Sequence, residues 1–163
     1  MEEDEGAFGA PAFALIELFF FAYRDFVADP DRVLADYGFG RAHHRVLHFV
    51  SRRPGLAIAE ILDVLRITKQ SLNRVLKELV DKGFVEQRAG TSDRRQRLLY
   101  PTEIGRDLAT RLAQIQTSRI ERALEEAGGT AAERAATRFL LGMIDADGRS
   151  HVQPADGADR LSG

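Results

Sequence analysis

The sequence contains no cysteine. This absence excludes disulfide bonds, thiolate metal sites and cysteine nucleophiles, and it is compatible with a reducing compartment. The sequence also lacks a G-x-S-x-G elbow and a phosphate-binding glycine loop, and no histidine stands at a spacing from a carboxylate that marks a catalytic pair. We therefore expect a protein that is not an enzyme and carries no cofactor.

A long hydrophobic run is missing as well. The most apolar stretch, AFALIELFFFAY at residues 12–23, is about half of the roughly 20 residues that cross a bilayer, and it contains Glu17. It follows EEDE instead of a basic region, which argues against a secretory signal peptide. We expect a soluble, cytoplasmic protein with no membrane partner. A content of 44% apolar residues is enough for a real core.

The net charge of −2 hides an uneven distribution. Between Arg66 and Arg97, nine cations stand against four acids, so this window carries +5 and the remainder of the chain carries −7. A basic centre in an acidic chain indicates one cationic face and an anionic partner.

The N-terminal part of the chain predicts an arm and two helices. Residues 1–10 are acidic and are expected to form a flexible arm. Residues 11–28 predict a helix that is apolar nearly all round, and such a helix must be buried on every side. In a chain of this size, that burial indicates a subunit interface. Asp29-Pro30 predicts the N-cap and first residue of a further helix that ends near Gly38.

The middle of the chain predicts three helices and a hairpin. The expected helices cover residues 41–53, 59–65 and 68–82, and the expected strands cover residues 84–88 and 96–100. Thr68 is the expected N-cap of the third helix, and Gly83 is the expected residue just after its end. A polar loop that contains Gly90 joins the two strands, which is typical of a hairpin.

The C-terminal part predicts two helices and a tail. A long helix runs from Thr102 to about Ala127. Its apolar stripe moves from one face to another along its length, so we expect its first half to pack on the lobe and its second half on a separate helical layer. Gly128-Gly129 ends it, and Thr130 with Glu133 forms a capping-box pattern for a last helix. Residues 145–163 are polar and turn-forming, which predicts disorder.

A helix, a tight turn, a second helix and a hairpin with a basic tip form a winged helix-turn-helix. On the third helix of the middle part, the polar residues occupy one face and Leu72, Val75, Leu76 and Leu79 occupy the other. Arg, Gln and Asn pair with base edges, and Lys and Ser hold phosphates. The residues expected to bind DNA are Thr68, Lys69, Gln70, Ser71, Asn73, Arg74, Lys77, Arg94, Arg95 and Arg97.

Residues 41–112 resemble the core of the MarR family of bacterial transcriptional regulators. The resemblance rests on the stretch VLHFVSRRPGLAIAEILDVLRITKQSLNRVLKELVDKGFVEQ and on the wing SDRRQRLLYPTEIGRDL. Pro101 replaces the leucine that is usual in the family pattern. The segments RAHHRVLHFV and ITKQSL are most similar to the PetP-type subgroup. The expected fold class is mainly α with a small two- to three-stranded β wing.

The resemblance implies a homodimeric repressor that binds double-stranded DNA at a pseudo-palindromic operator. The DNA-binding lobe would cover about residues 41–101, and the dimerisation helices would cover about 11–38 and 103–144. The residues expected at the dimer interface are Phe13, Ile16, Phe19, Phe20, Tyr23, Ile120, Leu124, Phe139, Leu140 and Met143. Asp93 would hold the wing tip in shape by pairing with an arginine.

The resemblance also implies a small, often aromatic and anionic, effector between the dimer helices and the lobe. The residues expected in its pocket are His44, His48 and Phe49. Two alternatives stay open at this point. One is a metal-responsive regulator that uses His43, His44 and His48, although two histidines on one helix make an incomplete site and no metal is expected. The other is a winged helix that binds a protein.

Overall fold

The computed structural model describes residues 11–153, and the expectations for residues 1–10 and 154–163 therefore lie outside the described residues. Ten elements follow one another along the chain. They are α1 (Phe13–Ala35), α2 (Arg41–Arg52), β1 (Leu56–Ala57), α3 (Ile58–Leu65), α4 (Lys69–Asp81), β2 (Val85–Ala89), β3 (Arg97–Pro101), α5 (Glu103–Ala127), α6 (Thr130–Met143) and α7 (Ala146–Arg149). The expected fold class, mainly α with a small β wing, is confirmed.

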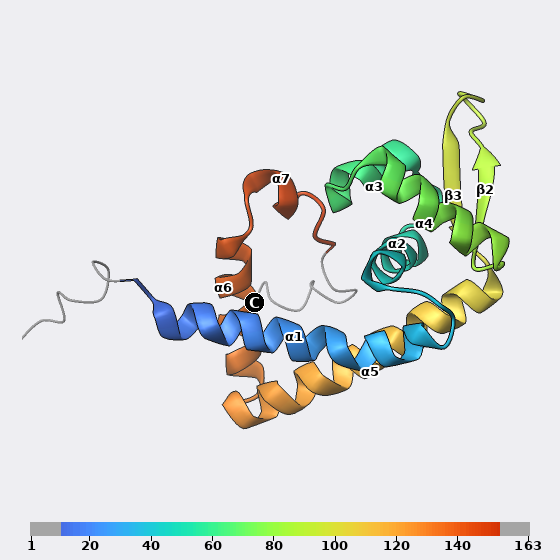
Figure 1. Cartoon of the computed structure of the whole chain (residues 1–163). Coiled ribbons are helices and arrows are strands. Elements are labelled where there is room, and N and C mark those ends of the chain that lie inside the picture. The colour runs from blue at the N-terminus through green and yellow to red at the C-terminus, as the bar shows by residue number, and fades with distance from the viewer. Residues whose placement is uncertain (1–10, 154–163) are drawn as a thin grey trace, which may run out of the picture.

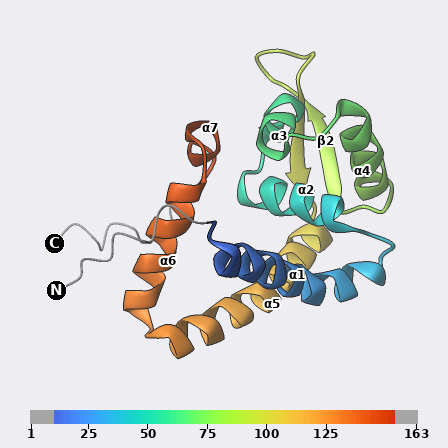
Figure 2. The ribbon, with the colours of Figure 1, turned by 60° about the vertical axis from the view of Figure 1, so that its left-hand side comes forward.

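The elements form a lobe and a helical region. The lobe contains α2, α3, α4 and the small sheet, and α1 and α5 pass below it in the view of Figure 2. The N-terminal half of α1 and the far end of α5 extend away from the lobe, and α6 turns back from the end of α5 (Figure 1). No helix within residues 11–153 combines the length and apolarity that crossing a membrane requires.

The core lies in the lobe and extends into the first half of α5. Its fully buried side chains include Leu47 of α2, Ile61 of α3, Leu76 of α4, Leu99 of β3 and Leu112 of α5. On α4, Leu72, Val75, Leu76 and Leu79 are all buried and recur at the spacing that places apolar side chains on one helix face. Further along α5, Ile120 is 46% exposed and Leu124 is half-buried, so the second half of the stripe is only partly covered within the described chain.

The sheet is antiparallel and has the order β1-β3-β2. Leu56 of β1 pairs with Leu99 of β3, and Gln87 of β2 pairs with the same residue on the other side. The central strand thus joins the wing to the segment that precedes α3. The wing is anchored to the core at its base and carries polar residues toward its tip.

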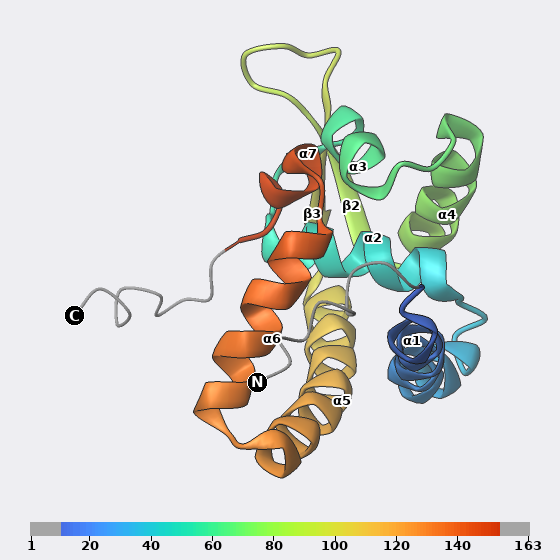
Figure 3. The ribbon, with the colours of Figure 1, turned by 90° about the vertical axis from the view of Figure 1, so that its left-hand side faces the viewer.

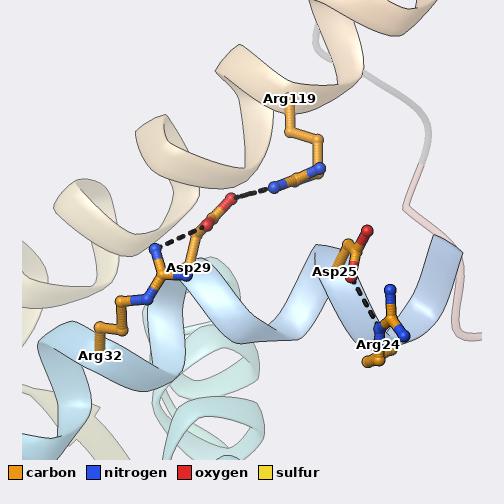
Figure 4. A network of polar contacts seen from close by, with 5 residues as sticks. All are labelled: Arg24, Asp25, Asp29, Arg32 and Arg119. Atoms are coloured by element: carbon orange, nitrogen blue, oxygen red, sulfur yellow. Dashed lines mark hydrogen bonds and ion pairs between the residues drawn. The ribbon is translucent and has the colours of Figure 1, made fainter. Parts of the chain in front are cut away.

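The expected helix start at Asp29-Pro30 is wrong, because α1 continues through Pro30 to Ala35. Asp29 does not cap a helix, since its carboxylate is used elsewhere. Arg119 of α5 donates from Nε and Nη2 to Asp29 Oδ2 at 3.0 and 2.8 Å, and Arg32 donates to Oδ1 at 3.3 Å (Figure 4). The separate pair Arg24–Asp25 lies further along α1 in the same view. The Asp29–Arg119 contact ties α1 to α5.

Two expectations for the C-terminal part also differ from the structure. Thr130 is the first residue of α6 and not its cap, because the N-cap position is Gly129, which follows Gly128 in the left-handed region. Residues 145–153, expected to be disordered, contain α7 and take a defined path. Composition did not reveal their contacts, which include a hydrogen bond from Arg53 of the lobe to the backbone oxygen of His151.

Candidate nucleic-acid interface

The start of α4 has the geometry that its sequence predicts. Thr68 is the N-cap, and its Oγ1 accepts a hydrogen bond from the backbone N–H of Ser71 at 3.1 Å. The Thr68 hydroxyl in turn donates to Ser71 Oγ at 2.9 Å. At the other end, Gly83 has φ of 80°, and the N–H of Phe84 donates to Leu79 O, which closes the helix as a left-handed C-terminal turn. The helix is therefore fixed at both ends.

The two faces of α4 separate as the periodicity predicts. Leu72, Val75, Leu76 and Leu79 are buried in the core of the lobe. The opposite face is open to solvent and carries Lys69, Gln70, Asn73, Arg74 and Lys77. The helix N-terminus has a partial positive charge of its own, so side chains and backbone together present a site for an anion.

Lys77 stands apart from the other cations of this face. Its ammonium group pairs with Asp81, one helical turn along α4, and this hydrogen bond raises the pKa of Lys77. The pair is exposed, so a phosphate can compete with Asp81 for the ammonium group. Lys69 and Arg74 lie nearer the helix start.

The wing tip is shaped by backbone contacts. The N–H of Gly90 donates to Gln96 O at 2.9 Å, and the N–H of Gln96 donates to Asp93 O at 3.1 Å. A side chain at position 90 would place Cβ 2.4 Å from Asp93 O, so only glycine fits. The Asp93 carboxylate accepts from the backbone N–H of Arg95 at 2.9 Å, in place of the arginine side chain that the family resemblance implied.

The wing cations are exposed and are carried away from the core. Arg94 and Arg95 lie in the loop and Arg97 begins β3, and all three side chains are open to solvent. The loop extends beyond the helices of the lobe in each view, most clearly in Figure 3. The structure thus places every expected DNA-binding residue on the surface of one lobe. Contact of these residues with DNA stays a prediction.

The contact that holds α4 against α2 could not be identified from the sequence. His43 of α2 is only 8% exposed, and its Nδ1 accepts a hydrogen bond from the backbone N–H of Gly40 at 3.0 Å. Its Nε2–H therefore donates to Glu78 Oε2 of α4 at 2.9 Å. The contact spans 35 residues of sequence, and no local pattern signals it. His43 positions α4 against α2.

These contacts also bear on the metal alternative. Both ring nitrogens of His43 are engaged, so this histidine could bind a metal only by breaking its bonds to Gly40 and Glu78. In the part of the chain from residue 11 to residue 153, no three histidine or carboxylate side chains come together in an arrangement suited to a metal ion.

The three expected pocket residues lie beside a cavity of about 240 Å³. The cavity is lined by Tyr23, Phe26 and Val27 of α1, by Arg41, His44, Arg45, His48 and Phe49 of α2, and by Gln116 of α5. Burial lowers the pKa of His44, and the nearby His48 lowers it further, while Asp31 opposes both effects. Burial also lowers the pKa of His48, together with Arg52 and Arg53. The neutral imidazoles are therefore favoured here.

The helical region has an exposed apolar surface. It contains large side chains of α1 and α6, among them Phe13 (68% exposed), Phe20 (70%) and Met143 (60%). Phe19 stacks on Phe139 with ring centroids 5.7 Å apart, which joins the two helices. Of the expected interface residues, Ile16, Tyr23, Ile120 and Leu140 are also exposed, and Phe19 and Leu124 are half-buried. Large exposed apolar side chains that gather in one region mark interaction surfaces in soluble proteins.

Comparison with known proteins gives consistent results. The model of the MarR family matches residues 37–96. The chain is 48% identical, over 138 residues, to the HTH-type transcriptional regulator PetP of Rhodobacter capsulatus, and the match covers 85% of this chain and 82% of that protein.

Solved structures share the fold. A MarR protein from Peptoclostridium difficile has a TM-score of 0.68 at 15% identity, with 88% of this chain and 92% of that chain covered. A MarR family regulator from Listeria monocytogenes, solved in complex with 26mer DNA, has a TM-score of 0.68 at 19% identity and covers 79% of this chain and 85% of that chain. At these identities the likeness concerns the fold alone.

Proposed function

The chain belongs to the MarR family of DNA-binding transcriptional regulators, and from this we propose that it acts as a homodimer on a pseudo-palindromic operator. One winged lobe of each subunit would bind one half-site, with α4 in the major groove and the wing over the adjacent minor groove. A bacterial regulator works where the DNA lies, so we also propose a cytoplasmic location.

The observation that carries this proposal is the exposed polar face of α4 beside a basic wing. Gln70, Asn73 and Arg74 would meet base edges, because amides pair with adenine and arginine pairs with guanine. Lys69, Ser71 and Lys77 would hold phosphates. Thr68, the N-cap of α4, would place the start of the helix at the DNA backbone. Arg94, Arg95 and Arg97 would follow the minor groove.

The homodimer is supported by the apolar surface of α1 and α6. A second copy is the partner whose surface has the same chemistry, and a twofold interface pairs one patch with itself. In this arrangement, residues 11–38 and 103–144 would form the dimerisation region, and residues 41–101 would form the DNA-binding lobe.

A small anionic effector is the proposed regulator of binding. The cavity beside His44 and Phe49 combines aromatic walls with the cations Arg41 and Arg45, which suits an aromatic anion. It lies between helices of the dimerisation region and α2 of the lobe. An occupant could therefore favour one position of the lobe over another, and relief of repression is the expected outcome.

The decisive experiment removes one base contact and one wing contact. We expect Arg74→Ala combined with Arg95→Ala to abolish operator-specific binding in fluorescence anisotropy, and Lys69→Ala to reduce the salt slope by about 1. Arg122→Ala, an exposed cation near the end of α5, is the matched control and should bind as the unmodified protein does. Unchanged, salt-insensitive affinity of the double variant would support the protein-interaction alternative.

A further inference from the structure

The segment that follows α6, residues 144–153, folds back onto the lobe. In Figure 3, α7 lies at the upper end of α6, beside α3. The guanidinium of Arg53 donates from Nη2 to the backbone oxygen of His151. His151 Nε2 lies 3.2 Å from Asp63 Oδ2, and Arg66 Nη2 lies 3.9 Å from Asp147 Oδ2. Three polar contacts thus join this segment to the lobe.

The three lobe residues in these contacts lie between the end of α2 and the start of α4. Arg53 is the C-cap of α2, and Asp63 lies near the end of α3. Arg66 is the C-cap of α3 and holds the left-handed region with φ of 50°, which is rare for a residue other than glycine. Thr68, the N-cap of α4, follows two residues later. The segment therefore rests against the helix and turn that direct α4.

The other end of the segment belongs to the helical region. It continues α6, which packs on α5 and contacts α1 through the rings of Phe139 and Phe19. The lobe is also joined to this region by the α1–α2 connection and by α5, and Leu34, Leu108 and Leu112 belong to its core. Each further attachment reduces the freedom of the lobe to rotate against the helical region. The docked segment adds such an attachment at α3.

The docking is weak enough to be changed by single residues. Asp63 and Asp147 are mostly exposed, and ion pairs between exposed groups stabilise only slightly. Between the segment and the lobe, a cavity of about 480 Å³ remains, lined in part by Phe49, Val64 and Val152. The segment is thus held by a few polar contacts and not by a close-packed apolar interface.

We propose that residues 144–153 are a positioning element that fixes the angle between the lobe and the helical region. In a dimer, this angle sets the distance between the two copies of α4, and therefore the half-site spacing that the protein accepts. Asp63 and His151 are positioning residues and do not touch DNA. The proposal rests on the dimeric DNA binding proposed above.

The docking is tested by distance measurement on the full chain. Because the sequence has no cysteine, Ala59→Cys on α3 and Ser150→Cys in the segment can be spin-labelled specifically, and both positions are exposed. The doubly labelled chain is diluted in unlabelled protein so that a dimer carries labels in one subunit, and we expect one narrow intrasubunit distance distribution by double electron–electron resonance. A broad distribution in the otherwise unmodified protein would overturn the proposal at its first step.

The positioning role is tested by a charge swap. Asp63→Lys places a cation against His151, and His151→Asp places a second acid against Asp63, so each should release the segment and broaden the distance distribution. Combining the two changes places a lysine opposite an aspartate at the same two positions and should restore the narrow distribution. Asp107→Lys, which changes an exposed acid of α5 by the same charge, is the control.

The functional readout is the ratio of affinities for the selected operator and for operators one base pair longer or shorter. Overall charge effects on affinity cancel in this ratio. We expect each single swap to lower it by about fivefold, the lower end of typical coupling between sites, and the double swap to restore it. An unchanged ratio in a variant with a released segment would overturn the proposal. If no variant and no unmodified protein bound any DNA, the proposed function itself would fall, while the distance measurement would still decide the docking.

Discussion

His43 Nε2 lies 2.9 Å from Glu78 Oε2, and this contact joins α2, which lines the candidate effector cavity, to α4, the candidate recognition helix. The same imidazole caps the start of α2 through the N–H of Gly40. The ring also stacks on Phe39 with centroids 4.8 Å apart. One side chain thus fixes the relative position of two elements whose proposed roles differ.

The first prediction concerns this link. His43→Ala removes the two hydrogen bonds and the stacked ring, and should lower the free energy of unfolding by about 2 kcal/mol, the usual cost of breaking such a buried contact. Glu78→Gln keeps an oxygen that accepts from Nε2–H, so its cost should stay below about 1 kcal/mol. Urea unfolding measures both. Equal losses for the two variants would show that the hydrogen bond is not what His43 contributes.

The second prediction separates charge from shape at the wing tip. Asp93→Ala removes a negative charge that faces the proposed phosphates, and charge alone would strengthen DNA binding. It also removes the acceptor for the N–H of Arg95, and we expect this loss to dominate and to weaken binding by roughly 1 kcal/mol, about fivefold in Kd. Asp93→Asn keeps the acceptor and should bind at least as tightly as the unmodified protein. Anisotropy titration at one fixed salt concentration distinguishes the two variants, and tighter binding by Asp93→Ala would contradict the structural role.

The third prediction concerns the apolar surface of the helical region. Phe20 is 70% exposed, so a charged residue there leaves the fold of one chain intact and makes a buried subunit interface unfavourable. We expect Phe20→Glu to shift the protein from dimer to monomer in light scattering coupled to size exclusion. Ile104→Glu is the matched control, since Ile104 is 51% exposed but lies on the lobe side of α5. A dimer that survives Phe20→Glu and dissociates with Ile104→Glu would place the interface elsewhere.

The fourth prediction is a pH dependence of stability. The pKa of His44 is lowered in the folded protein, chiefly by burial. Unfolded His44 titrates near pH 6.5, so below that pH the unfolded chain takes up a proton that the folded chain does not. The free energy of unfolding should therefore fall as the pH drops from about 6.5 toward the folded pKa, and level off below it.

His44→Gln isolates this contribution from those of other groups. The loss of stability between pH 7.5 and pH 5.5 should be smaller in the variant than in the unmodified protein, by urea unfolding at both values. If His44→Gln retained the full loss, burial of His44 would not be its source.

Most of the DNA-binding lobe follows from local sequence signals. Thr68 as a cap, the apolar stripe that begins at Leu72, and Gly83 at the helix end are all readable within one helix, and each has the expected geometry. The hairpin is readable for the same reason, since alternation and a glycine-containing loop are local patterns.

The contacts that join distant segments were not readable. Asp29 stands before a proline and predicts a helix start, but it pairs with Arg119, 90 residues away, and α1 runs on through Pro30. The histidines at positions 43, 44 and 48 raise a metal-ligand hypothesis, whereas His43 bonds to Gly40 and to Glu78, and the second contact spans 35 residues. The polar composition of residues 145–153 predicts disorder. Their order comes from contacts with Arg53, Asp63 and Arg66, which local composition does not reveal.

We propose that this protein recognises a specific double-stranded site as a twofold dimer. Selection of bound fragments from genomic DNA with the purified full chain tests it most directly. We expect enrichment of one pseudo-palindromic sequence, with half-sites about one helical turn apart, and loss of that enrichment in the Arg74→Ala, Arg95→Ala double variant. Recovery of fragments with no common palindrome, or the same fragments from the double variant, would contradict it.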